Sequence, residues 1–122
     1  MSAPEIVNIL FLGWNGYLAA VAARSRDQED GTWAQPFTRS VTVELLAEVM
    51  EGDALEVAVR AVSRRLRSFV LELSVRRTSD NRVVATGQTV QVCIAEAGSP
   101  GIPSSLWRAV EEIESRTIPR SG

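Results

Sequence analysis

The stretch Glu5–Arg26, EIVNILFLGWNGYLAAVAARSR, decides the fold, because it suits three different kinds of protein. No residue from Ile6 to Ala23 carries a charge. Such a run is typical of a secretory signal, of a membrane span, or of an apolar helix that covers the core of a soluble domain.

The residues around and within this run favour the buried helix. A secretory signal begins with positive charge, whereas the residues here are Ser2, Ala3, Pro4 and Glu5. A membrane span of minimal length tolerates two Asn and two Gly poorly. The strand patterns downstream also need an apolar cover. We therefore expect a helix over about residues 6–24, buried on nearly all sides, and no membrane partner.

Composition limits the possible functions. The chain has 122 residues, 45% of them hydrophobic and 23% charged, which is typical of one soluble globular domain. A net charge of −2 gives no electrostatic support for nucleic-acid binding. All 13 basic residues are Arg. We expect a single domain over 1–122, a cytoplasmic location and no nucleic-acid partner.

The chain contains no His and a single Cys, Cys93. This composition removes the commonest general base and the commonest metal ligand. A Cys-His nucleophilic pair is impossible, and we expect neither a metal site nor a cofactor. Catalysis would have to use carboxylates, amides, hydroxyls, backbone N–H groups or Arg.

After the polar stretch that follows Arg24, the hydrophobic period changes to two. We predict strands over about 37–49, 54–64, 68–78 and 82–94. In the first of them, one apolar face comprises Phe37, Val41, Val43 and Leu45, and the opposite face comprises Thr38, Ser40, Thr42 and Glu44. Short connections, including MEGD and RTSDNR, favour antiparallel neighbours in a meander. A helix over about 104–115 ends the pattern, so the expected fold is α+β, with a long helix across a curled antiparallel sheet of four or five strands.

From Phe37 to Ile94 this pattern resembles the hotdog thioesterases, particularly the 4-hydroxybenzoyl-CoA thioesterase-like group. The matching segments are VTVELLAEVMEGDALEV, RRLRSFVLELSVRR and RVVATGQTVQVCI, followed by PGIPSSLWRAVEEI, which is similar to the Pro-containing loop and final helix of that group. The resemblance implies a hotdog domain that acts as a homodimer or homotetramer on thioesters of CoA or acyl-carrier protein.

The apolar helix is similar to two hotdog signatures in different registers. VNILFLGW resembles the end of an Asp-x-x-Gly-His-Val-Asn-Asn segment, which implies site roles for Asn8, Phe11 and Trp14. WNGYLAAVAAR resembles an Asn-Gly-Gly-Tyr-Leu-Ala signature, which implies site roles for Asn15, Gly16 and Tyr17. Both registers depart from the family, because the His position holds Ile6 or Trp14 and no carboxylate lies within the helix.

A thioesterase site needs a polarised carbonyl and an attacking water. We predict that Asn8, Asn15 and Gly16 set the carbonyl. If the helix proper begins near Asn15, Gly16 allows the carbonyl to approach the free N–H groups at the helix N-terminus. Glu44 is the predicted acid, with Glu48 and Glu5 as alternatives. These residues have ordinary structural interpretations too: Asn caps or kinks helices, and a Glu on a strand usually faces water.

Substrate contacts are predicted at Phe11, Trp14 and Tyr17, although aromatic residues on a buried helix often belong to the core. The turn RRLRS supplies Arg64, Arg65, Arg67 and Ser68 as predicted ligands of the carrier phosphates, or alternatively forms a solvated turn. The hypothesis is an acyl thioester hydrolase. The alternative is a catalytically inactive thioester-binding or assembly subunit, favoured by the missing His and helical acid.

Overall fold

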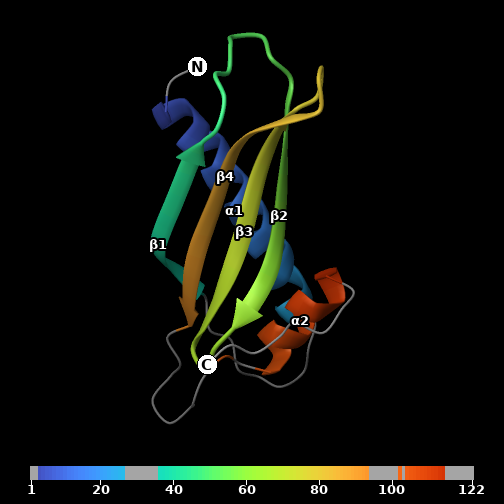
Figure 1. The fold of residues 1–122 in the computed structure, drawn as a ribbon. Helices are drawn as coiled ribbons and strands as arrows, with labels where there is room; N and C mark the ends of the chain where they lie inside the picture. Colours follow the sequence, from blue (N-terminus) through green and yellow to red (C-terminus); the bar gives the residue numbers. More distant parts are fainter. Residues whose placement is uncertain (1–2, 27–35, 94–101, 103, 115–122) are drawn as a thin grey trace.

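The computed structural model describes residues 3–26, 36–93, 102 and 104–114. In these residues, two helices and four strands form the α+β arrangement that the sequence predicts, with α1 behind the sheet in the view of Figure 1. The elements are α1 (Ala3–Arg26), β1 (Pro36–Leu45), β2 (Leu55–Arg64), β3 (Ser68–Arg77), β4 (Arg82–Cys93) and α2 (Ser104–Glu114). β1 stops at Leu45, short of the predicted end at residue 49. The predicted ends at residues 94 and 115 lie outside the described residues.

The predicted meander is correct for β2, β3 and β4 and wrong for β1. All neighbours are antiparallel, but the strand order is β1-β4-β3-β2, so β1 pairs with β4 rather than β2. The connection over residues 46–54 crosses one end of the sheet. The N–H groups of Leu46 and Ala47 donate to the Val84 carbonyl at 2.9 and 3.2 Å, which directs the chain away from a hairpin.

Two turns form where the composition predicts them. In MEGD, Gly52 has a φ of +87° and the Met50 N–H donates to the Asp53 carboxylate at 2.9 Å. In RTSDNR, Asn81 adopts the left-handed conformation with a φ of 60°. A hydrogen bond from the Arg77 guanidinium lowers the pKa of Asp80, and the same guanidinium donates to the Glu48 carbonyl at 3.0 Å. Arg77 therefore ties this turn to the crossing connection.

One face of the sheet packs against α1, as the sequence predicts. On β3 the buried residues are Phe69, Leu71, Leu73 and Val75, and on α1 they are Ile6, Leu10, Trp14 and Val21. α1 lies close to β2 at Gly13, where a Cβ atom would lie 2.7 Å from Val57 Cγ1. A larger residue at this position would separate the two layers.

The prediction that α1 is buried on nearly all sides is wrong. Its outward face leaves Phe11 48% and Leu12 63% exposed, because a single sheet can cover only one side of a helix. By length and composition, Glu5–Arg24 would suffice to cross a membrane, and 22% of that stretch is buried in the chain. α1 therefore presents an apolar surface to whatever lies outside the single chain.

The predicted position of Phe37 on the same face as Val41 is wrong, because β1 contains a β-bulge. The register with β4 shifts between Thr38 and Ser40, so Arg39 is an extra residue and the alternation reverses there. Thr38 consequently points to the α1 side, where its hydroxyl donates to Gln91 Oε1 at 3.0 Å. Phe37 pairs with Val92 on the opposite face. A period-two pattern cannot register an inserted residue, which is why the sequence placed Phe37 with Val41.

α2 closes the end of the core next to β2. The Phe69 and Trp107 rings meet edge to face, with centroids 5.7 Å apart. The Glu114 carboxylate accepts hydrogen bonds from the Tyr17 hydroxyl at 2.7 Å and from the Ala61 N–H at 3.2 Å. This carboxylate joins α1, β2 and α2.

Candidate functional site on the outer face of the sheet

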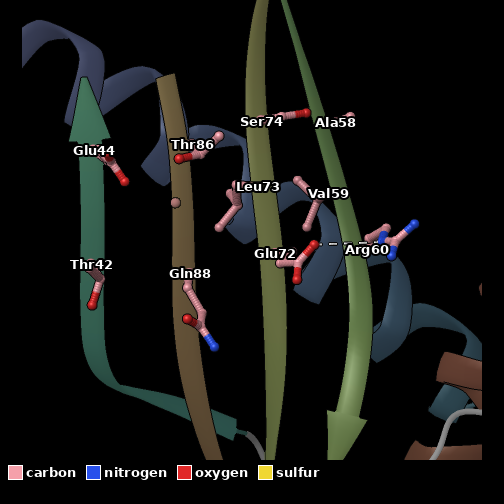
Figure 2. A pocket seen from close by; sticks show the side chains of 11 residues that line it. Thr42, Glu44, Ala58, Val59, Arg60, Glu72, Leu73, Ser74, Thr86 and Gln88 are labelled. Carbon is pink, nitrogen blue, oxygen red and sulfur yellow. Dashed lines mark ion pairs between the residues drawn. The ribbon is translucent and has the colours of Figure 1, made fainter. Parts of the chain in front are cut away.

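The face of the sheet turned away from α1 is polar and hollowed. Three consecutive rungs of outward-facing side chains cross all four strands. In the order β1, β4, β3, β2 they are Ser40, Val90, Val70 and Ser63; then Thr42, Gln88, Glu72 and Arg60; then Glu44, Thr86, Ser74 and Ala58. Figure 2 shows the second and third rungs, with α1 on the far side of the sheet. We call this surface the outer trough.

The outer trough comprises two hollows that share Gln88. One, of about 630 Å³, lies over the second and third rungs and includes Glu44. The other, of about 560 Å³, lies over the first rung and is lined by Arg39, Arg64 and Arg65. A positively charged end therefore adjoins a polar middle and a carboxylate.

The structure brings three predicted site residues into the outer trough. Glu44 stands beside Thr86 in the third rung, and Arg65 and Ser68 line the charged end. Arg64 also borders this hollow, but it pairs with Phe69, which faces the α1 side of the sheet. Arg67 lies exposed in the same turn, where its carbonyl accepts the Cys93 N–H at 2.8 Å. The turn RRLRS therefore borders a hollow in which an anion could bind, as its interpretation as an anion site requires.

The predicted helical residues lie elsewhere. Asn8, Phe11, Asn15 and Gly16 are all exposed on the outward face of α1, on the opposite side of the sheet from Glu44. The condition for the Gly16 role, a helix that begins near Asn15, is not met, since α1 begins at Ala3. The Asn15 side-chain amide donates to the Phe11 carbonyl at 2.8 Å, within the helix. The Gly16 N–H is therefore inside the helical ladder rather than available to an oxyanion.

Two predicted substrate contacts, Trp14 and Tyr17, and the two alternative acids, Glu5 and Glu48, lie outside the outer trough. Trp14 is 4% exposed in the core, and Tyr17 is engaged with Glu114. Glu5 is exposed in the first turn of α1, and Glu48 is exposed in the crossing connection. None of these four residues lines either hollow of the outer trough.

Sequence reasoning missed Arg39 and the middle of the outer trough. Alternation predicts that Ser40 and Thr42 lie on the outward face, but it does not show that Gln88 lies between Thr42 and Glu72. Arg39 became a candidate only through the bulge, because a regular strand would have pointed it to the other face. The signal available in the sequence was the break in alternation at Thr38-Arg39-Ser40.

The charges of the outer trough are unevenly compensated. Arg60 pairs with Glu72 at 3.8 Å, whereas no carboxylate lines the hollow at the charged end. The Arg64 guanidinium lies 4.9 Å from the centroid of the Trp107 ring of α2, a cation–π contact on the side of the sheet that carries Phe69 and α1, away from the trough. Within the described part of the chain, no group of three or more His, Cys, Asp or Glu side chains is placed to hold a metal ion.

The Cys93 thiol is 1% exposed, and burial raises its pKa from 9.0 to about 11. The native state therefore keeps this proton at a pH at which the unfolded chain loses it, so stability falls as the pH rises through this interval. Relative to Cys93→Ala, the wild type should lose about 2 kcal/mol of unfolding free energy between about pH 8 and about pH 10.5. Urea unfolding at both pH values checks this; equal losses in the two proteins would contradict it.

The comparison with known proteins agrees with this architecture. No curated protein matches the chain significantly. Among solved structures, a thioesterase from Thermus thermophilus complexed with coenzyme A and zinc is 25% identical, with a TM-score of 0.64 over 91% of this chain and 82% of that one. A 1,4-dihydroxy-2-naphthoyl-CoA thioesterase from Synechocystis is 15% identical, with a TM-score of 0.70 over 93% and 85%.

A 4-hydroxybenzoyl-CoA thioesterase variant complexed with 4-hydroxybenzoyl-CoA is 18% identical, with a TM-score of 0.68 over 90% of this chain and 85% of that one. These likenesses confirm the hotdog fold that the strand pattern and the helix suggested. The model of the thioesterase-like superfamily matches residues 10–111, which include the whole sheet and most of both helices. The chain therefore belongs to the thioesterase-like superfamily.

Proposed function

We propose that this protein hydrolyses acyl-CoA thioesters in the outer trough. The observation that carries the proposal is the outer trough itself, where arginines lie at one end and a carboxylate at the other, in a chain of this superfamily. Three of the similar structures are thioesterases whose names or ligands include CoA. Arginines bind phosphates, and the hydroxyl and amide side chains between the two ends can hydrogen-bond a pantetheine arm.

Glu44 is the proposed general base. A carboxylate can take a proton from the attacking water, which the amides of Asn8 and Asn15 cannot do. The water oxygen adds to the thioester carbon, and the carbon–sulfur bond then breaks. The acyl group leaves as a carboxylic acid, and the proton held by Glu44 passes to the departing CoA thiolate. Gln88, in the adjoining rung of the neighbouring strand, can donate its side-chain N–H to the developing oxyanion (Figure 2).

We also propose a homo-oligomer, either a dimer or a tetramer, in the cytoplasm. The outward face of α1 carries exposed Val7, Phe11 and Leu12, and the edge strand β1 carries exposed Val41 and Leu45. Monomeric soluble proteins rarely leave large apolar patches in water.

Thiol release from a panel of aromatic and aliphatic acyl-CoAs tests the proposal. We expect wild-type protein to release CoA and Glu44→Gln to lower kcat about 10²-fold or more. Glu56→Gln is the matched control, because Glu56 is also an outward-facing strand carboxylate but pairs with Arg76 outside the trough. Sedimentation of each variant verifies that its oligomeric state is unchanged. Cys93 contributes little background, since its thiol is buried.

Two results would contradict this assignment. If Asn15→Ala abolishes release while Glu44→Gln retains it, the reaction takes place on the α1 side and Glu44 is not the base. If wild type releases no thiol from any member, yet CoA raises its Tm, the protein is a thioester-binding subunit. The alternative function, a thioester-binding subunit without catalytic activity, is supported by the absence of a carboxylate from Ile6 to Ala23 of α1 and by the absence of His from the chain. Thiol release from the same acyl groups attached to acyl-carrier protein, compared with release from the acyl-CoAs, would identify the preferred carrier.

A further inference from the structure

We propose that Gln91 is a positioning residue of the outer trough: its buried side chain holds Thr38 on the α1 side and so maintains the β-bulge at Arg39. This role goes beyond the proposed function, because it holds whether or not the trough hydrolyses thioesters. It is suggested by an unusual feature of the core. Among the described residues, Thr89 and Gln91 are the only buried polar side chains, and both lie on the sheet face that otherwise packs apolar residues against α1.

A short chain of hydrogen bonds connects these two side chains to β1. The Thr38 hydroxyl donates to Gln91 Oε1 at 3.0 Å, and Gln91 Nε2 donates to Thr89 Oγ1 at 2.8 Å. The first bond crosses from β1 to β4, whereas the second stays within β4. A buried amide oxygen without a donor is costly. Gln91 therefore requires a donor at the position opposite it on β1, and the Thr38 hydroxyl supplies this donor.

A regular β1 would deny Gln91 this donor. In register with the residues that follow, it would bring Arg39 opposite Gln91 and turn Phe37 to the α1 side. The Arg39 guanidinium would extend past the amide to water at the edge of the sheet, where even Val41 is 42% exposed. The regular strand would therefore gain the burial of Phe37 and an unbroken ladder but leave the Gln91 oxygen without a donor. The hydrogen bond to Gln91 is what favours the bulge over this alternative.

The two parts of β1 are held unequally. After the bulge, six residues (40–45) pair with β4, whereas before it three residues (36–38) do so. Removal of the Gln91 hydrogen bond should therefore shift the shorter part by one residue and leave the longer part in place. Phe37 would turn to the α1 side, and Arg39 would leave the charged hollow that it lines.

Fluorine NMR tests this role without substrate. The chain contains three Phe residues, so labelling with 4-fluorophenylalanine gives three signals, and Phe37→Leu assigns that of Phe37. A soluble paramagnetic agent should broaden the wild-type Phe37 signal, since this ring is 44% exposed, and leave the signal of the buried Phe69 ring sharp. In Gln91→Met, which keeps the length of the side chain but lacks the amide, most of the broadening of the Phe37 signal should be lost.

Variants of the two threonines separate positioning from stability. Thr38→Val removes the same hydrogen bond from the other side and should give the same loss of broadening, whereas Thr38→Ser retains the hydroxyl and should behave like wild type. Thr89→Val is the matched control, because it removes the bond within β4 and leaves the bond to β1 in place. We expect it to leave the Phe37 signal as broad as in wild type, since a general loosening of the core does not change the register of β1.

This role is overturned if the Phe37 signal stays as broad in Gln91→Met and Thr38→Val as in wild type, if Thr89→Val loses as much broadening, or if the wild-type Phe37 ring is already protected. Thiol release in wild type, with unchanged Phe37 broadening in Gln91→Met, would overturn only the role of Gln91. The expected spectra without thiol release from any acyl-CoA would instead overturn only the proposed activity.

Discussion

Phe69→Ala should destabilise the protein by about 3–5 kcal/mol. The Phe69 side chain is 0% exposed, and it contacts Trp107 edge to face across the junction of β3 and α2. Removal of the ring would leave a cavity that neighbouring strands in a hydrogen-bonded sheet cannot easily fill, so the full cavity cost applies. Urea unfolding followed by Trp fluorescence measures the change.

Phe37→Ala is the matched control for this substitution. The alternation pattern would give both Phe residues a core position, but the bulge at Arg39 leaves Phe37 on the outer face and 44% exposed. We expect a loss of about 1 kcal/mol or less for Phe37→Ala. Comparable losses in the two variants would show that β1 has no bulge and that Arg39 does not point into the trough.

Gly13→Ala should destabilise the protein by about 1–2 kcal/mol, although Ala is the better helix former by about 1 kcal/mol. The new Cβ would lie 2.7 Å from Val57 Cγ1 and 3.5 Å from Val59 Cγ2. Val57 cannot rotate away cheaply, since a β-branched side chain is stiff at χ1. The contact would force α1 away from β2, and urea unfolding would record the loss.

Gly16→Ala, one turn further along α1, should have the opposite effect. Nothing lies within 4 Å of the position that its Cβ would occupy, so the gain in helix propensity should stabilise the chain by about 0.5–1 kcal/mol. The double variant Gly13→Ala/Val57→Ala should lose less than the sum of its single losses, because the shorter side chain relieves the clash. If the losses of stability in the two single variants add up in the double variant, the Gly13→Ala loss does not come from a clash with Val57. A loss for Gly16→Ala would mean that another copy packs on that face.

The sequence predicts individual residues of the candidate site but not how the sheet groups them. Glu44, Arg65 and Ser68 can be predicted, because alternation identifies outward side chains and a run of arginines is visible in the sequence. Their grouping with Gln88 could not be predicted, since it depends on β4 lying between β1 and β3. The resemblance to a family motif predicts site roles for the amides of α1, and only the position of the sheet shows that these amides face away from Glu44.

The sequence by itself determined the types of element, the long apolar helix, the two turns and the hotdog arrangement. These features follow from local rules: hydrophobic period, glycine and asparagine at left-handed positions, and the need of an apolar sheet face for a cover. The tertiary structure alone decided that β1 joins β4, that α1 buries one face and that Arg39 reaches the outer trough. Each of these depends on contacts between residues far apart in the chain, where a single inserted residue in a strand reverses every side chain beyond it.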